Sequence, residues 1–169
     1  MSTQTAEPVE MGTRPIREHE WLQKLVGEWR TESEMSMGPD QPKQHGQGSE
    51  SIKSLGGLWA FAEGEDTMPG GGRMTYYAGI GYDVSFREYR SFWVASVSSH
   101  LWTKAGQVSD DGRVLTLTGE GPDMQRDGEK ASYRDVFEII DDNHFTLTHY
   151  GQNERGEWQE FITSRYTRK

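Results

Sequence analysis

Residues 133–150 read YRDVFEIIDDNHFTLTHY, a stretch in which two alternating segments flank the turn-forming residues at 141–143. Successive side chains of a strand point to opposite faces, so Phe145, Leu147 and His149 share one face of the second segment. Both segments contain aromatic and β-branched residues, which favour strands, and Asp and Asn are typical of tight turns. The stretch therefore predicts an antiparallel β-hairpin.

The same alternation of short segments and turn residues continues along most of the chain. The 20 glycines mark turns, and the six Trp, seven Tyr and six Phe favour strands. The predicted strands are 28–37, 45–54, 58–67, 73–83, 89–98, 100–109, 113–119, 131–140, 144–151 and 157–167. Consecutive hairpins form an up-and-down meander, and closure of the meander removes its two exposed edges. We therefore predict an all-β fold, a single antiparallel β-barrel of about ten strands.

One short segment near the N-terminus has helical periodicity. Residues 17–26 predict a helix that ends at Gly27, a residue type that is common at the helix C-cap. Its apolar face, which we expect to plug one mouth of the barrel, consists of Trp21, Leu22, Leu25 and Val26. Residues 1–15 are polar and aperiodic, so they are predicted to be a disordered tail, and the barrel domain then spans residues 16–169.

The chain is acidic, with 27 Asp and Glu against 18 Lys and Arg and a net charge of −9. Such a surface repels phosphate backbones and anionic membranes, so we expect neither nucleic acid nor a membrane as a partner. No apolar run is long enough to span a bilayer, and the N-terminus lacks the apolar core of a secretory signal, which makes the cytoplasm the expected location. The absence of cysteine excludes a disulfide scaffold, a zinc ribbon and thiol catalysis.

The interior of the predicted barrel suits a cavity better than a solid core. The chain is poor in Leu, Ile and Val, and several predicted strands mix aromatic residues with Ser, Thr and His. Such a mixture lines a ligand pocket more naturally than it fills one, although the rings could also simply pack together. The candidate pocket residues are Trp59, Phe61, Glu63, Tyr76, Trp93, Trp102, Tyr133, Phe137 and His149.

Two of these candidates supply polar groups. Glu63 follows Trp59 and Phe61 at a spacing of two residues, so it shares their face and is our candidate interior carboxylate. His149 could anchor a ligand or bind a haem iron. No two of the five histidines are spaced two residues apart, so we predict no metal site and no cofactor, with haem as the alternative.

Gly27, Glu28 and Trp29 follow the predicted helix and open the first strand, in the G-x-W pattern of lipocalin-like (calycin) barrels. In such barrels the tryptophan packs across the barrel floor, and a basic residue of the last strand covers its ring. The resemblance implies that Trp29 closes the barrel together with Arg165 or Arg168, and we assign Arg165 to this role.

The wider pattern resembles the bacterial DUF1579 family. The segments that carry the resemblance are LVGEW (25–29), LGGLW (55–59), GIGYD (79–83), YRSFWVAS (89–96), DDGRVLTLTGEG (110–121), YRDVFEIIDDNHFTLTHY (133–150) and SRYTRK (164–169). The resemblance covers residues 19–169 and implies a lipocalin-like barrel of unknown function. A looser similarity to nitrobindin-like haem barrels rests on His19, Leu22, Leu25, Gly27 and Trp29.

Three functions are compatible with these patterns. The leading hypothesis is a cytoplasmic barrel that binds a small, largely apolar molecule in its lumen. The second is an enzyme or haem protein that uses the same pocket; no G-x-S-x-G motif is present, and the sequence does not decide whether a reaction takes place. The third is a homodimer or larger homo-oligomer that assembles through outward aromatic residues such as Tyr77 or Phe92. Barrels host all three roles, so the fold alone does not choose among them.

Overall fold

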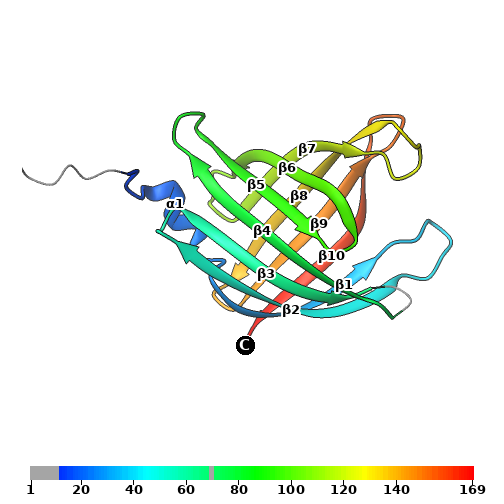
Figure 1. Ribbon diagram of the computed structural model, residues 1–169, viewed down its shortest axis with the longest axis horizontal. Coiled ribbons are helices and arrows are strands. Elements are labelled where there is room, and N and C mark those ends of the chain that lie inside the picture. Colours follow the sequence, from blue (N-terminus) through cyan, green and yellow to red (C-terminus); the bar gives the residue numbers. More distant parts are fainter. Residues whose placement is uncertain (1–11, 69–70) are drawn as a thin grey trace, which may run out of the picture.

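The computed structural model describes residues 12–68 and 71–169, which form one closed β-barrel with a short helix at one end (Figure 1). The elements are α1 (Arg17–Leu22), β1 (Gly27–Met35), β2 (Gln44–Leu55), β3 (Trp59–Thr67), β4 (Arg73–Asp83), β5 (Glu88–Ala95), β6 (Ser98–Val108), β7 (Val114–Pro122), β8 (Lys130–Asp141), β9 (His144–Gln152) and β10 (Trp158–Arg168). Each strand pairs in antiparallel fashion with its neighbours in sequence, and β1 pairs with β10. The predicted up-and-down barrel of ten strands is therefore confirmed.

Strands β1 and β10 close the barrel. Their register runs from Trp29 opposite Arg168 to Met35 opposite Ile162. On their other sides, β1 pairs with β2 and β10 pairs with β9. Because each of these strands has two neighbours, the first and last strands of the meander do not present an open edge to another chain.

The helix α1 is shorter than the sequence indicates, because it ends at Leu22 and not at residue 26. The backbone N–H groups of residues 23–26 donate to carbonyls three residues earlier, which is a tighter pattern than that of an α-helix. Gly27 then opens β1 with a φ angle of 148° and does not cap the helix. No helix among the described residues is long and apolar enough to cross a bilayer.

The residues before α1 include most of the predicted tail. Residues 1–11 lie outside the described residues, and residues 12–16 precede the helix without forming a helix or strand. The predicted boundary between tail and domain at residue 16 stays a prediction.

The apolar face of α1 covers one mouth of the barrel. Trp21 is buried, and its Nε1 atom donates to the carbonyl oxygen of Gly112 at 2.8 Å, in the loop between β6 and β7. The hydroxyl of Tyr89 donates to the carbonyl oxygen of Glu18 at 2.7 Å. These contacts attach the helix to the loop between β6 and β7 and to the start of β5.

Trp29 lies at the floor of the barrel, just inside α1, and is 1% exposed. Its ring meets that of Phe145 edge-on, with 4.7 Å between centroids, and Phe145 stacks on Tyr166 at 4.1 Å. The indole Nε1 donates to the carbonyl oxygen of Leu25 at 2.8 Å. The Trp29 ring thus connects the segment that follows α1 to strands β9 and β10.

Arg168, and not Arg165, covers the ring of Trp29. The Arg168 guanidinium lies 4.2 Å from the ring centroid, while Arg165 pairs with Glu34 at 3.3 Å. The register explains this correction, because Arg168 is directly opposite Trp29 and Arg165 is three residues away, on the other face of β10.

The buried core occupies only the half of the barrel next to α1. Its residues from the strands lie near the strand ends that adjoin the helix: Trp29, Ile52, Ala60, Ala62, Ile80, Tyr89, Leu115, Leu117, Phe145 and Tyr166. Toward the other end of the barrel, at the right in Figure 1, the inward side chains surround a cavity and include both aromatic and polar residues. The lumen is therefore filled at one end and hollow toward the other.

Candidate ligand-binding cavity

The hollow half of the barrel holds a cavity of about 330 Å³. The cavity extends from the core residues Leu25 and Ile52 to Met68 and Met124, which lie in loops at the opposite end. Its lining is mainly apolar, and its volume lies in the lower part of the range that is usual for ligand pockets. The cavity is therefore a candidate site for a small organic molecule.

Aromatic rings form much of the cavity wall. The centroids of Tyr76 and Trp93 are 6.0 Å apart, and Trp102 meets Tyr133 edge-on at 4.9 Å. The predicted pocket residues that line the cavity are Tyr76, Trp93, Trp102, Tyr133, Phe137 and His149. Their contact with a ligand stays a prediction.

Trp59, Phe61 and Glu63 lie on the outer face of β3, so the expectation that they face the lumen is wrong. Trp59 and Phe61 are each 38% exposed, whereas Ala60 and Ala62 between them are buried and line the cavity. The alternation along β3 is therefore as predicted, but its two faces are exchanged.

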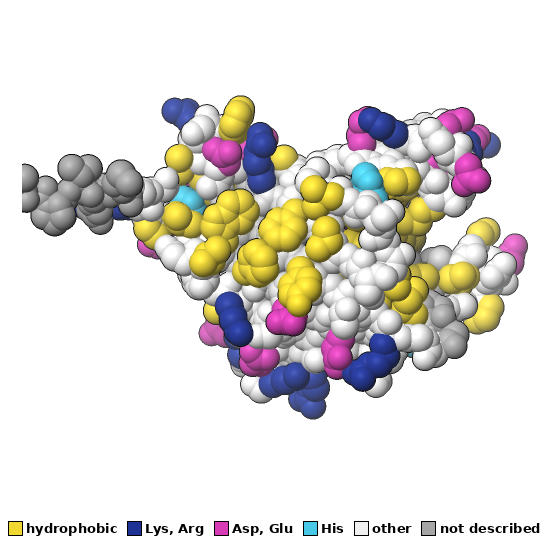
Figure 2. All heavy atoms as spheres, in the orientation of Figure 1, with side chains coloured by type: hydrophobic (Ala, Val, Ile, Leu, Met, Phe, Trp, Pro, Cys, Tyr) yellow, Lys and Arg dark blue, Asp and Glu magenta, His cyan; other side chains and the backbone are white. Residues whose placement is uncertain are grey.

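Two glycines on β4 explain why these large rings lie outside. Gly81 is opposite Trp59, and a Cβ atom at Gly81 would lie 2.6 Å from the Trp59 ring. Gly79, opposite Phe61, is covered by the ring of Phe92, and the two phenylalanine rings are 5.5 Å apart. Figure 2 shows the resulting group of apolar side chains on the outside of the barrel over β3, β4 and β5. The homo-oligomer expected from such outward rings stays a prediction.

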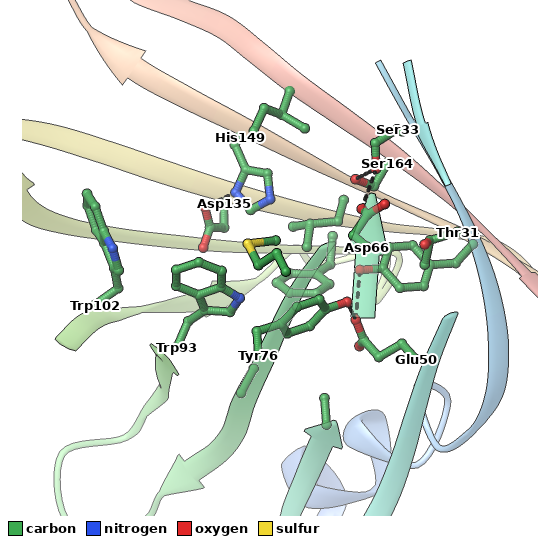
Figure 3. Close-up of a pocket in the computed structure, with 18 of the residues that line it drawn as sticks. Thr31, Ser33, Glu50, Asp66, Tyr76, Trp93, Trp102, Asp135, His149 and Ser164 are labelled. Atoms are coloured by element: carbon green, nitrogen blue, oxygen red, sulfur yellow. Dashed lines mark hydrogen bonds and ion pairs between the residues drawn. The ribbon is translucent and has the colours of Figure 1, made fainter. Parts of the chain in front are cut away.

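One wall of the cavity carries a largely buried group of three polar side chains, drawn in part in Figure 3. Asp135 and His149 are directly opposite each other on β8 and β9, and His149 Nδ1 lies 2.7 Å from Asp135 Oδ1. The Nζ atom of Lys104 lies 2.8 Å from Asp135 Oδ2. Because an ionised carboxylate can only accept a hydrogen bond, Nδ1 donates to Asp135, and Nε2 is the ring nitrogen left to meet a ligand.

The two partners of Asp135 keep it ionised. Burial raises the pKa of Asp135, but the charges and hydrogen bonds of His149 and Lys104 lower it more, so that the pKa lies below its usual range. Among the described residues, no three His, Cys, Asp or Glu side chains are grouped so that they could hold a metal ion. Asp135 thus has Lys104 as a counter-charge within a wall that also carries aromatic rings.

Across the barrel, Glu50 on β2 supplies a second buried carboxyl group, which is 7% exposed. The hydroxyl of Tyr76 donates to Glu50 Oε2, and the hydroxyl of Tyr166 donates to the same oxygen at 3.1 Å. Burial raises the pKa of Glu50 more than these two hydrogen bonds lower it. Burial and the adjacent carboxyl also raise the pKa of both tyrosines, so both phenols stay protonated as donors.

Asp66 on β3 lies beside Glu50, and only one of its two carboxylate oxygens accepts a hydrogen bond from a side chain that the structure describes. The hydroxyl of Ser33 donates to Asp66 Oδ2 at 3.3 Å and lies 2.8 Å from the Ser164 hydroxyl. Asp66 Oδ1 and Thr31 Oγ1 are buried and have no hydrogen-bond partner among the described residues. Burial raises the pKa of Asp66. This side of the cavity therefore has acceptor capacity that the protein itself does not use.

Four polar residues of the site, Glu50, Asp66, Lys104 and Asp135, were not among the predicted pocket residues. Part of the signal was present in the sequence, since Asp135 alternates with Tyr133 and Phe137, and Lys104 is two residues from Trp102. Ionised side chains are seldom buried, so alternation alone is weak evidence that such residues face the lumen.

Gly64 allows Tyr76 to reach Glu50. The three residues are neighbours on adjacent strands, and a Cβ atom at Gly64 would overlap the Tyr76 ring. We expect Gly64→Ala to lower the free energy of unfolding by about 1–3 kcal/mol, because the ring must move. Gly151→Ala on β9 is the control, since its nearest neighbour would be at 3.5 Å, an ordinary contact. Equal melting temperatures of the two variants, measured by circular dichroism, would show that Tyr76 does not depend on Gly64.

The fold resembles those of solved barrel proteins at low sequence identity. Rv2717c from M. tuberculosis is 11% identical, with a TM-score of 0.65 over 91% of this chain and 98% of that chain. The S-type phycobiliprotein lyase CPES from Guillardia theta is 10% identical, with a TM-score of 0.61 over 92% of this chain and 98% of that chain. These likenesses support the fold only, and no curated protein matches the sequence.

The family comparison covers almost the whole barrel. The family model described as "Protein of unknown function (DUF1579)" matches residues 14–168. These residues include α1 and all strands from β1 to β10, and so the elements that build the cavity. The chain therefore belongs to the DUF1579 family.

Proposed function

We propose that the protein binds a small, largely apolar molecule in the lumen of its barrel. The observation that carries this proposal is the cavity of about 330 Å³, which lies between aromatic walls in a barrel whose other half is well packed. Pockets that combine an apolar lining with a few fixed polar groups are typical of small-molecule sites. The absence of cysteine fits a reducing compartment, and we place this binding protein in the cytoplasm.

The cavity wall supplies both parts of such a site. Tyr76 and Trp93 offer ring faces for an apolar or aromatic body. His149 provides a polar anchor through Nε2, because Asp135 holds Nδ1 and thereby fixes the ring. Since Lys104 holds the other oxygen of Asp135, the anchor is positioned before a ligand arrives.

The neutral fluorescent probe N-phenyl-1-naphthylamine tests the proposal directly. We expect its fluorescence to rise on binding, and we expect Ala78→Leu, which adds bulk to the cavity wall, to weaken binding at least about tenfold. Ala105→Leu is the matched control, because Ala105 pairs with Arg90 on the outer face and does not line the cavity. Equal probe affinity in the two variants would place the binding site outside the lumen.

A native mass spectrum of the protein, purified from cells without refolding, tests for a natural ligand. An additional mass that is lost on mild activation would support carriage of a small molecule and begin to identify it. A Soret band in the purified protein that disappears in His149→Ala would replace this proposal with the haem alternative. A mass equal to that of the bare chain, together with absent probe binding, would overturn the proposal.

A further inference from the structure

The two polar groups of the cavity differ in how their charge is balanced (Figure 3). On one side, Asp135 has both Lys104 and His149 as partners. On the other side, Glu50 and Asp66 form no ion pair with any Lys, Arg or His among the described residues, and the side chains that donate hydrogen bonds to them do so through hydroxyl groups. The second side is therefore a buried acidic site without a counter-charge.

A buried polar side chain at this site also lacks a partner. Thr31 is 3% exposed, lines the cavity, and has no hydrogen-bond partner for Oγ1 among the residues described. In the strand register, Gly48 lies between Thr31 and Asp66, so no side chain separates the two. A Cβ atom at Gly48 would overlap the backbone oxygen of Glu65 and would lie 2.8 Å from Thr31 Oγ1, so the glycine lets β2 and β3 approach closely at this point. Thr31 and Asp66 thus line the cavity on either side of Gly48, each with a buried oxygen that has no partner within the described part of the chain.

The chemistry of these unpartnered oxygens selects among possible ligand groups. A carboxylate only accepts hydrogen bonds, so unused carboxylate oxygens call for a donor, and ionisation of a buried carboxyl calls for a positive charge beside it. A protonated amine supplies three N–H donors and one positive charge, whereas an anionic group would be repelled. The rings of Tyr76 and Trp93 border the same space and favour a cation near their faces.

We infer that the natural ligand carries a protonated amine on an apolar, aromatic-sized body, and that the amine binds between Glu50, Asp66 and Thr31. This inference rests on the proposed function and names the chemical class of its ligand. Burial raises the pKa of both carboxyls in the empty cavity, and a bound ammonium group favours their ionised forms. The apolar body then lies along Trp93 toward His149.

Three compounds with the same ring system test the inference by displacing N-phenyl-1-naphthylamine. They are 2-(2-naphthyl)ethylamine, 2-(2-naphthyl)ethanol and 2-naphthylacetic acid, which are cationic, neutral and anionic at neutral pH. We expect the amine to displace the probe at a concentration at least about tenfold lower than the alcohol, and the acid to be the weakest. Asp66→Asn and Glu50→Gln should each reduce the preference for the amine to about threefold or less.

Glu63→Gln is the matched control, because Glu63 lies on the outer face of β3 and should leave the preference unchanged. Circular dichroism confirms that each variant is folded before its affinity is compared. If the amine and the alcohol displace the probe equally well from the wild-type protein, the inference fails while the proposed function stands. If neither the probe nor the amine binds, as measured by fluorescence and by calorimetry of the amine alone, the proposed function fails and the inference fails with it.

Discussion

The Trp29→Ala variant is expected to lose about 3–5 kcal/mol of unfolding free energy, the usual cost of removing a large buried ring. Trp29 is 1% exposed and contacts Phe145 edge-on at 4.7 Å. The substitution also removes the hydrogen bond from Nε1 to Leu25, so it separates the end of the α1 segment from the barrel floor. In a chain of 169 residues this loss corresponds to a fall in melting temperature of about 10 °C, measurable by circular dichroism or calorimetry.

The two arginines of the last strand provide the control for this prediction. Arg168 lies over the Trp29 ring and donates to the carbonyl oxygen of Val26 at 2.8 Å, so Arg168→Ala should destabilise the barrel clearly. Arg165 makes only a surface ion pair with Glu34, so Arg165→Ala should leave the melting temperature unchanged. Equal destabilisation by the two substitutions would contradict the assignment of Arg168 as the residue that closes the barrel.

Strand positions and barrel closure could be predicted from the sequence because their signals are local. The turn at 141–143 and the alternation on either side of it lie within one stretch of 18 letters, and the structure has β8 and β9 there. The end of α1 was less accessible, because residues 23–26 keep helical spacing while their hydrogen bonds tighten. The spacing of apolar residues does not distinguish these two backbone patterns.

The orientation of β3 shows what the local sequence pattern does not determine, namely which face of a strand points into the barrel. Alternation separates Trp59 and Phe61 from Ala60 and Ala62 but does not say which set faces inward. The rings lie outside because β4 offers glycines at the opposite positions, including Gly81, and this pairing depends on the neighbouring strand. When a strand has apolar residues on both faces, its own sequence therefore does not predict which face points inward.

The polar groups of the cavity depend on pairings over still longer separations. Glu50 receives a hydrogen bond from Tyr166, which is 116 residues away in sequence, and Asp135 contacts His149, 14 residues away. These contacts need the register of the closed barrel, which single-strand patterns do not contain. The prediction of His149 as an inward residue came from alternation, whereas its carboxylate partner needed the pairing of β8 with β9.

Asp135→Ala is expected to lower the free energy of unfolding by about 3–5 kcal/mol, the usual cost of breaking a buried ion pair. The side chains of Lys104 and Asp135 are only 9% and 15% exposed, so the substitution leaves the Lys104 ammonium group in the barrel without its carboxylate. His149 loses the partner of Nδ1 at the same time. Urea denaturation of the wild-type protein and the variant measures this difference in unfolding free energy, provided that the free energy depends equally steeply on urea concentration in both proteins.

The double variant Asp135→Ala, Lys104→Met separates the unpaired charge from a general loss of packing. We expect it to be more stable than Asp135→Ala, because an apolar residue in place of Lys104 removes the uncompensated buried charge. The difference between the wild-type protein and Asp135→Ala should also depend on pH. Because the folded pKa of Asp135 lies below its unfolded value, its contribution is complete above about pH 4 to 5 and decreases as the pH falls through the folded pKa. A difference that stays constant down to about pH 2 would show that Asp135 acts through packing and not through its charge.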